Sequence, residues 1–351
     1  MVTKTSITAS YKGALVEYDG PQLAYFVSSR GYKMLAVAVD RDDMDYAMFA
    51  VEVSDVLFDR YLLGKTDLAS LFRTAPKTRL YFLDFLMLRD NEIKLWKADL
   101  QDLGNDDFYP LPGLFSTTHT SNFSQIDEVG LETERFYIDG KWDARDFAQF
   151  SGKLADTYSL VRISGKLSST TDLEDRDLLV SLIEDRRWQG GGSYGGFYAS
   201  TKEKTRRDYP LNVIGIEYHS PGYIDMRGHA DTLNEVIASI LVYLDNRQKF
   251  DEEYRGLHKL LQREGLLSAD KSQAFSSEET RSYAVRRCIS LADNLGLPNT
   301  EKLSAMCASA PVFVKVILSF FRRIKALSLF YVEGRVRSDE PPISIRFGSD
   351  Q

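Results

Sequence analysis

Cysteine and histidine are scarce in this sequence of 351 residues. It contains two cysteines, Cys288 and Cys307, and four histidines. Two thiols exclude a disulfide framework and a zinc site made of four cysteines. His219, Asp225 and His229 lie close together in the sequence, but their spacing matches no standard metal site. We therefore expect no metal ion and no other cofactor.

Long apolar runs are also missing. The most apolar stretch, residues 310–321, is interrupted by Lys315 and is too short to span a bilayer. The first residues lack the apolar core of a signal peptide. These absences predict that the protein has no transmembrane segment and that it is located in the cytoplasm.

No complete catalytic motif is present. Ser220 follows His219, but Pro221 stands directly after the serine, where a nucleophile elbow has Gly-x-Ser-x-Gly. Proline has no N–H group to contribute to an oxyanion hole. We assign no catalytic residue and expect a protein that is not an enzyme. The run Ser220-Pro221-Gly222 instead predicts a structural turn, in which Pro221 sets the first central φ and Gly222 supplies a positive second one.

Apolar and aromatic side chains are plentiful. Hydrophobic residues make up 43% of the chain and charged residues 27%, a balance that suits packed cores rather than global disorder. The net charge of −7 argues against a surface that coats nucleic acid or anionic lipid as a whole.

The pattern of apolar periods and turn residues predicts an α+β fold. It has an N-terminal antiparallel sheet domain, a central α+β unit and a C-terminal helical region. The predicted parts are a β-rich domain with short helices at 1–110, a linker at 111–130, the α+β unit at 131–228, the helical region at 229–335 and a tail at 336–351.

Within the first domain we expect a curved antiparallel sheet with short helices on one side. Ser54 and Asp67 are predicted to cap two of these helices. The predicted strands are 15–18, 23–27, 34–39, 47–53, 79–86 and 92–97.

The central unit is predicted to begin with a strand at 132–138 that ends in the hairpin-type dipeptide Asp139-Gly140. Asp143 is predicted to cap a helix that runs to about residue 158. The further elements expected here are a strand at 159–163, a helix from 171 or 172 to 187, and strands at 197–200 and 213–218. The predicted C-terminal helices are 232–250, 257–267, 277–295, 299 or 300 to 308, and 311–331.

The densest group of unusual residues is the glycine-rich run 190–196. It lacks the spacing of a phosphate-binding P-loop and of a dinucleotide-binding turn. As a loop, it could offer backbone amides to an anion, with cations on both sides, or it could be a mobile connector between helix and sheet. The candidate ligand- or anion-binding residues are Arg186, Arg187, Gly190, Gly191, Gly192, Ser193, Tyr194, Lys202, Lys204, Arg206 and Arg207.

Two segments carry a resemblance. The run Tyr18-Asp19-Gly20-Pro21, followed by two strands, resembles a sheet module of uncharacterised bacterial proteins. The segment 216–224, which contains Ser220-Pro221-Gly222, resembles a hairpin module of the same kind. The resemblance implies a component of a bacterial phage-defence or toxin-type system, and it implies no catalytic residue.

Three functions follow as hypotheses. The first is a non-enzymatic interaction or regulatory protein that acts through protein–protein contacts and oligomerisation, with a protein partner or a second copy of itself. The alternative is a nucleotide- or nucleic-acid-binding protein that uses the run 190–196 and its basic neighbours, since basic and aromatic residues together suit single strands. The third is a divergent enzyme whose site is built across domains.

Overall fold

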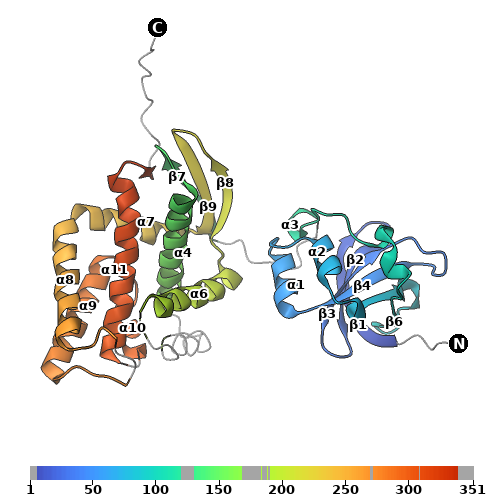
Figure 1. The fold of residues 1–351 in the computed structure, drawn as a ribbon, viewed down its shortest axis with the longest axis horizontal. Helices are drawn as coiled ribbons and strands as arrows, with labels where there is room; N and C mark the ends of the chain where they lie inside the picture. Colours follow the sequence, from blue (N-terminus) through green and yellow to red (C-terminus); the bar gives the residue numbers. More distant parts are fainter. Residues whose placement is uncertain are drawn as a thin grey trace, which may run out of the picture. The chain divides into compact units, whose positions relative to one another are not determined.

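The computed structural model describes residues 6–119, 130–167, 183, 188, 190–268, 272–307 and 309–338, without the side chains of 118, 119, 190–193, 207 and 208. Its contacts divide the chain into two compact units, Met1–Gln125 and Ile126–Gln351 (Figure 1). The division falls inside the predicted linker. The second unit contains both the predicted α+β unit and the predicted helical region, and one hydrophobic core runs through the two.

The first unit is built around a closed barrel of six antiparallel strands. They are β1 (Ser6–Glu17), β2 (Pro21–Ser28), β3 (Lys33–Ala38), β4 (Ala47–Val53), β5 (Leu80–Asp84) and β6 (Glu92–Lys97). Closure depends on β1, whose first residues pair with β6 and whose later residues pair with β2. Register shifts after Tyr11 and after Ala14 mark bulges, which bend a strand and increase its twist. The curved sheet predicted from the sequence is therefore a closed one.

Short helices accompany the barrel and begin where their caps predict. Ser54 accepts a hydrogen bond from the backbone of Leu57 at the start of α1 (Asp55–Leu62), and Asp67 accepts one from Ser70 at the start of α2 (Leu68–Thr74). Phe58 of α1 and Phe72 of α2 pack with apolar side chains of the strands. The remaining short helices are η1 (Lys77–Arg79), η2 (Phe85–Met87), η3 (Asp102–Gly104), η4 (Asp106–Phe108) and α3 (Ser116–His119).

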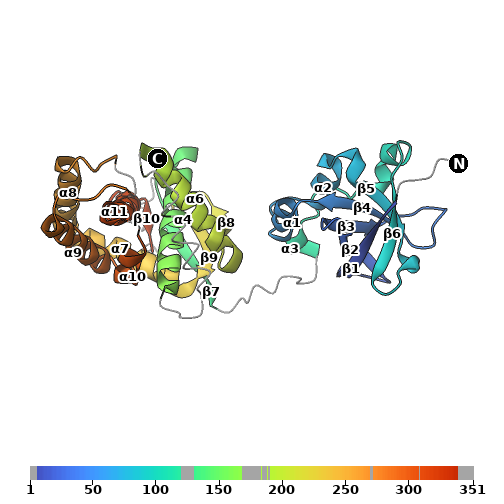
Figure 2. The same cartoon turned by 90° about the horizontal axis from the view of Figure 1, so that it is seen from below.

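The second unit combines an antiparallel sheet with a layer of helices (Figure 2). The strand order is β10 (Val336–Arg337), β7 (Leu131–Ile138), β9 (Gly222–His229) and β8 (Asn212–Glu217). The prediction of a hairpin at Asp139-Gly140 is wrong, because β7 is followed by a helix and both its partners come from later in the chain. Strand β9 was not predicted.

The described helices of this unit are α4 (Ala144–Lys166), α6 (Gly190–Asp208), α7 (Ala230–Asp245), α8 (Arg247–Arg263), α9 (Glu278–Asn294), α10 (Thr300–Met306) and α11 (Ala310–Val332). Helix α4 starts with the predicted Asp143, which forms a capping box with Asp146. It continues through the predicted strand 159–163, whose short apolar run fits a buried helix as well as a strand. The helix predicted at 232–250 ends at Asp245, and α8 follows it.

Helix α11 lies among the other helices and contacts α4, α7, α8 and α9 (Figure 1). It is buried over most of its length, although its sequence carries several cations. No helix among the described residues combines the length and the apolar character that a bilayer-spanning segment requires.

The glycine-rich run is helical, so the predictions of a loop at 190–196 and a strand at 197–200 are both wrong. Glycine costs about 1 kcal/mol relative to alanine within a helix. That cost is offset by tertiary burial of Phe197 and Tyr198, which are 0% and 1% exposed. Tyr194, Phe197, Tyr198 and Thr201 recur at the spacing of one helical face. The helix predicted at 171–187 lies outside the described residues except for Ile183.

The predicted turn at Ser220-Pro221-Gly222 joins β8 to β9, but with a different geometry. The Ser220–Pro221 peptide bond is cis, and Gly222 does not adopt a positive φ. Glycine is required there because a Cβ atom would collide with the carbonyl oxygen of Glu217 and lie 2.7 Å from that of His219. Close approach of backbone, rather than a positive φ, explains this glycine.

Candidate functional site

A cleft of about 660 Å³ opens among four helices of the second unit. Its volume lies in the range of small-molecule sites. Side chains from α4, α6, α8 and α11 line it. The lining residues are Lys153, Asp156, Tyr194, Gly195, Lys202, His258, Leu261, Leu267, Lys315, Leu318, Arg322 and Arg323.

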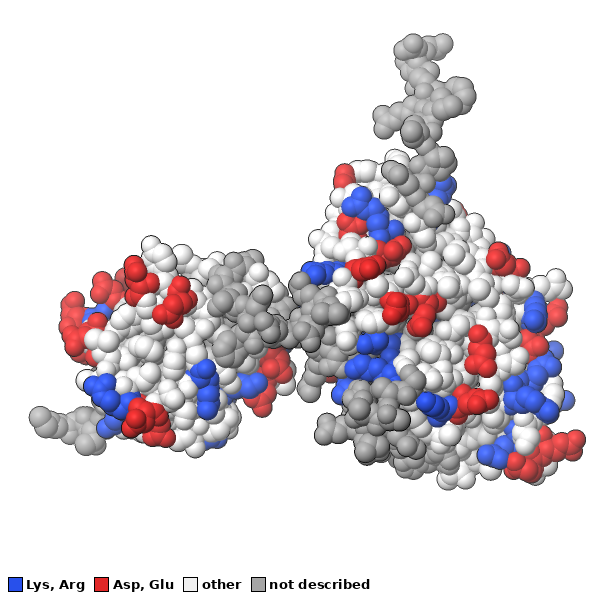
Figure 3. Space-filling view, turned by 180° about the vertical axis from the view of Figure 1, so that it is seen from behind, with Lys and Arg blue, Asp and Glu red and all other residues white. Residues whose placement is uncertain are grey.

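The cleft has a large excess of positive charge. Five of its side chains are lysine or arginine, and Asp156 is the only acid in the lining. The chain as a whole carries a net charge of −7. Over the face drawn in Figure 3, acidic and basic side chains are interspersed on both units. The charge of the cleft therefore contrasts with the rest of the molecule.

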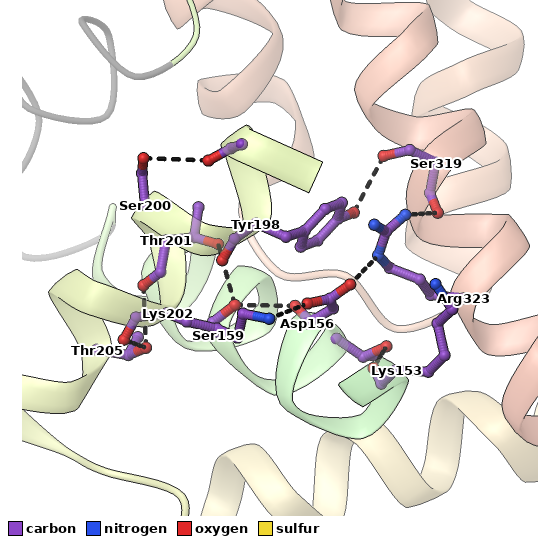
Figure 4. Close-up of polar contacts among 12 residues, drawn as sticks. Lys153, Asp156, Ser159, Tyr198, Ser200, Thr201, Lys202, Thr205, Ser319 and Arg323 are labelled. Carbon is purple, nitrogen blue, oxygen red and sulfur yellow. Dashed lines mark hydrogen bonds and ion pairs between the residues drawn. The ribbon is translucent and has the colours of Figure 1, made fainter. Parts of the chain in front are cut away.

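Asp156 lies between Lys202 and Arg323 (Figure 4). One carboxylate oxygen accepts a hydrogen bond of 2.8 Å from Nε of Arg323, and the other lies 2.7 Å from Nζ of Lys202. Arg323 also donates to the backbone carbonyl of Ser319 at 3.2 Å, and its guanidinium lies 3.4 Å from the ring centre of Tyr198. Each oxygen of Asp156 thus already has a cationic partner.

Buried hydroxyl groups hold the three helices in register around Asp156. The hydroxyls of Tyr198 on α6 and Ser319 on α11 lie 3.0 Å apart. Ser159 on α4 donates to the carbonyl of Asp156 at 2.9 Å and lies 3.1 Å from the hydroxyl of Thr201 on α6. These contacts are visible together in Figure 4. They connect α4, α6 and α11 directly behind the charged groups.

Lys153 precedes Asp156 by one helical turn on α4, and its ammonium group has no hydrogen bond or ion pair with any described residue. Its pKa is lowered, first by burial and then by the positive charges of Arg323, Lys202 and Arg322, which outweigh the opposite effect of Asp156. Burial is the larger cause of the lowered pKa, and the neighbouring cations act in the same direction.

Lys315 and Arg322 add further cations from α11. Lys315 is 2% exposed and donates to the carbonyl of Trp188 at 3.2 Å. Arg322 donates to the hydroxyl of Tyr254 at 3.4 Å, and its guanidinium lies 5.0 Å from the ring centre of Tyr194. The partner of Arg322 is a neutral hydroxyl, which holds the side chain in place without cancelling its charge.

The structure places the predicted site residues in different surroundings. Tyr194 and Lys202 line the cleft, whereas Arg206 pairs with Glu203 at 3.3 Å along the surface of α6. Lys204 also lies on α6 and is not part of the lining. The backbone of Gly190, Gly191, Gly192 and Ser193 forms the first turn of that helix. Arg186 and Arg187, and the side chain of Arg207, lie outside the described residues.

Most of the cleft was missed because it comes from helices that looked structural in the sequence. On α11, Lys315, Ser319, Arg322 and Arg323 recur at spacings of three and four within an otherwise apolar helix. That spacing places them on one face, and it is the signal that could have indicated a polar site inside the helical layer.

The turn residues and Asp225 make structural contacts. Ser220 donates to the carboxylate of Asp139 and accepts from the backbone of Gly140 at 3.2 Å, which ties the turn to the end of β7. Asp225 accepts two hydrogen bonds of 2.7 Å from Arg135. Among the described residues no three histidine, cysteine or acidic side chains are grouped so that they could hold a metal ion.

Comparisons of the chain with protein families, with curated proteins and with solved structures gave no match.

Proposed function

We propose that this protein binds a small anion that carries several phosphate charges, and that the cleft between α4, α6, α8 and α11 is the binding site. The observation that carries the proposal is the excess of cations over acids in the lining of this cleft. The ligand class is that of a nucleotide or another compact polyphosphate. The link to a phage-defence or toxin-type system remains part of the proposal.

The electrostatics of the cleft call for an anionic ligand. Cations that are withdrawn from water and held near one another repel, and burial weakens the solvation that would compensate. Asp156 can cancel only one unit of this charge, because it is a single carboxylate. A ligand with several negative charges removes the repulsion and supplies acceptors to Lys153, which has none among the described residues.

Phosphate suits this set of donors. Arginine presents a planar fork that matches two phosphate oxygens, and lysine acts as a mobile point charge. Arg322 and Arg323 each lie near the ring of a tyrosine that orients the guanidinium. The cleft volume fits a small molecule rather than a folded polymer.

Binding without catalysis is favoured by the state of Asp156. It is the only carboxylate of the lining, and each of its oxygens contacts a cation at 2.7 or 2.8 Å. A general base needs an oxygen that can approach the proton it removes. The site therefore resembles a receptor that senses an anion more than it resembles an active centre.

Calorimetric titration with inorganic triphosphate and with ATP tests the proposal. We expect both to bind with one site per chain, and binding to raise the melting temperature, since a ligand that binds only the folded state stabilises it. Lys153→Gln should weaken binding about 10- to 100-fold, because a hydrogen bond between charged groups contributes about 1.5–3 kcal/mol. Its melting temperature without ligand should not fall, because no described contact is lost.

Two variants serve as matched controls. Lys259 is an exposed lysine on α8, next in sequence to the cleft residue His258, and it is not part of the lining. Lys259→Gln and Arg206→Ala should leave affinity within about twofold of the unmodified protein, since exposed charges outside a site contribute little. Absence of binding by both probes, or an equal loss in Lys259→Gln, would contradict the proposal.

A further inference from the structure

Strand β8 is the last strand at one end of its sheet and is unusually exposed. Val213, Ile214 and Ile216 are each about half exposed, at 49%, 54% and 55%. Every residue of the strand except Gly215 is exposed, and Gly215 is partly buried. An edge strand with three exposed branched apolar residues is a site at which another strand can be added.

Two of these exposed residues, Val213 and Ile216, lie on the face of the sheet on which the paired β9 side chains are buried. Val213 pairs with Met226 and Ile216 pairs with Ile224 of β9. Met226 and Ile224 are 2% and 0% exposed. Residues paired across neighbouring strands point to the same face, so the covering that buries the β9 side chains does not extend to β8.

The usual protection of a sheet edge is weak in β8. Lysine, proline and inward-pointing charges commonly prevent strands from adding to an edge. The segment Asn212–Glu217 contains neither lysine nor proline. The one protective device present is a bulge between Val213 and Gly215.

We propose that β8 pairs antiparallel with β8 of a second copy of this chain, about a two-fold axis between Ile214 and Gly215. The two four-stranded sheets then become one continuous sheet. The proposal concerns self-association and is independent of the anion site.

The residues of β8 complement themselves in this register. Val213 of each copy lies opposite Ile216 of the other copy. The two-fold axis produces this pair twice, so apolar side chains meet on the partly covered face. Asn212 lies opposite Glu217 of the second copy on the other face, which allows an amide to donate to a carboxylate. Gly215 lies opposite Ile214 and leaves room for it at the bulge.

The neighbouring strand adds charge complementarity. Arg227 of β9 pairs with Asn212 and so lies on the same face beside it. Glu217 of the second copy follows on the other side of Asn212, which places opposite charges on one row across the new interface. A register shifted by one residue would set Val213 opposite Glu217. Residues that belong to opposite faces of the sheet would then be paired.

A second copy fits better than an unrelated extended peptide because the pairing is isologous. Each β8 uses the same residues and blocks the edge of the other, so the assembly closes as a dimer.

Sedimentation velocity of the full chain tests the interface. We expect a dimer of twice the monomer mass of 39.9 kDa at micromolar concentration. Ile216→Lys and Val213→Lys should each shift the protein to monomer, because they place a charge in the apolar row. The fold should be retained, since both side chains are already exposed. Leu241→Lys, at a 46% exposed leucine of α7, is the matched control and should stay dimeric.

A monomer of the unmodified protein across the concentration range would overturn the proposal. So would an equal dissociation of the Leu241→Lys variant, because the effect would then follow from added charge alone.

Disulfide crosslinking tests the register. The proposed pairing places residue 212 opposite residue 217 of the second copy, within disulfide distance. A mixture of Asn212→Cys and Glu217→Cys proteins should form a crosslinked dimer on mild oxidation. Neither variant alone should do so beyond the background of the native thiols. The proposed pairing would be wrong if either variant alone crosslinked as well as the mixture does. It would also be wrong if the protein were dimeric but the mixture of the two variants formed no crosslink.

Discussion

The two units of this protein treat sheet edges and buried charge in opposite ways. The barrel closes on itself, so each of its strands has two neighbours. Its buried acids have local partners: Glu52 pairs with Arg30 at 3.1 Å, and Asp84 accepts three backbone N–H groups, from Asp45, Tyr46 and Leu86. In the described part of the second unit, β8 is the last strand of its sheet, and one cleft is lined by five cations and a single acid.

The two units also differ in the charge that lines their hollows. A smaller hollow of about 290 Å³ lies on the barrel unit, but its cation Arg41 is already held between Asp43 and Asp102. A unit whose polar groups satisfy one another has little to gain from a ligand. In the proposals made above, the second unit binds an anion in its cleft and a second copy of the chain at β8.

The largest expected effect compares two buried acids. Asp156→Asn leaves Arg323, whose side chain is 9% exposed, without its counterion, and we expect a loss of about 3–5 kcal/mol. Glu52→Gln should cost only about 1 kcal/mol, because its partner Arg30 is half exposed and can turn to water. Urea unfolding of both variants measures the difference. Equal losses would show that the two units do not differ in this respect.

A smaller effect is expected at two helix caps. Backbone N–H groups of Gly113 and Ser70 lower the pKa of Asp67 in the barrel unit, and a hydrogen bond from Arg335 lowers that of Asp146 in the second unit. A lowered pKa in the folded state means that the stabilisation is present above the unfolded value of 3.8 and is lost as pH falls through the folded value.

Asp67→Ala should therefore cost about 1 kcal/mol at neutral pH, and the deficit should shrink on acidification as the native carboxyl group also becomes protonated. Peptide-resolved hydrogen exchange should place the effect of Asp67→Ala in the barrel unit and that of Asp146→Ala in the second unit. A deficit that stays constant down to about pH 3 would contradict the pKa argument.

The smallest effect concerns the thiols, both of which lie in the second unit. Burial raises the pKa of Cys307 to about 12 and also raises that of Cys288. Because the thiolate is the reactive form, alkylation at about pH 8 should be slow in the folded protein and should report opening of the second unit alone. Asp156→Asn should accelerate labelling and Glu52→Gln should not. Rapid labelling of the folded, unmodified protein would contradict this prediction, because the thiols would then react without any opening of the second unit.

Local signals predicted much of the fold. Strands β4 and β6 have the bounds expected from their sequences, and Ser54, Asp67 and Asp143 cap helices where predicted. The site was largely missed. Of the predicted residues with described side chains, Tyr194 and Lys202 line the cleft, while its central pair, Asp156 and Arg323, joins residues 167 positions apart. No local pattern connects residues at that separation.

The sequence by itself determined the α+β class, most strand and helix starts, and the absence of a complete catalytic motif, because caps, turns and apolar periods act over a few neighbouring residues. The tertiary structure alone decided three features. It closed the barrel through β1 and β6, it made a helix of the glycine-rich run by burying Phe197 and Tyr198, and it gathered cations from α4, α6 and α11 around Asp156. Each depends on contacts between distant segments, whose free energy outweighs local preference.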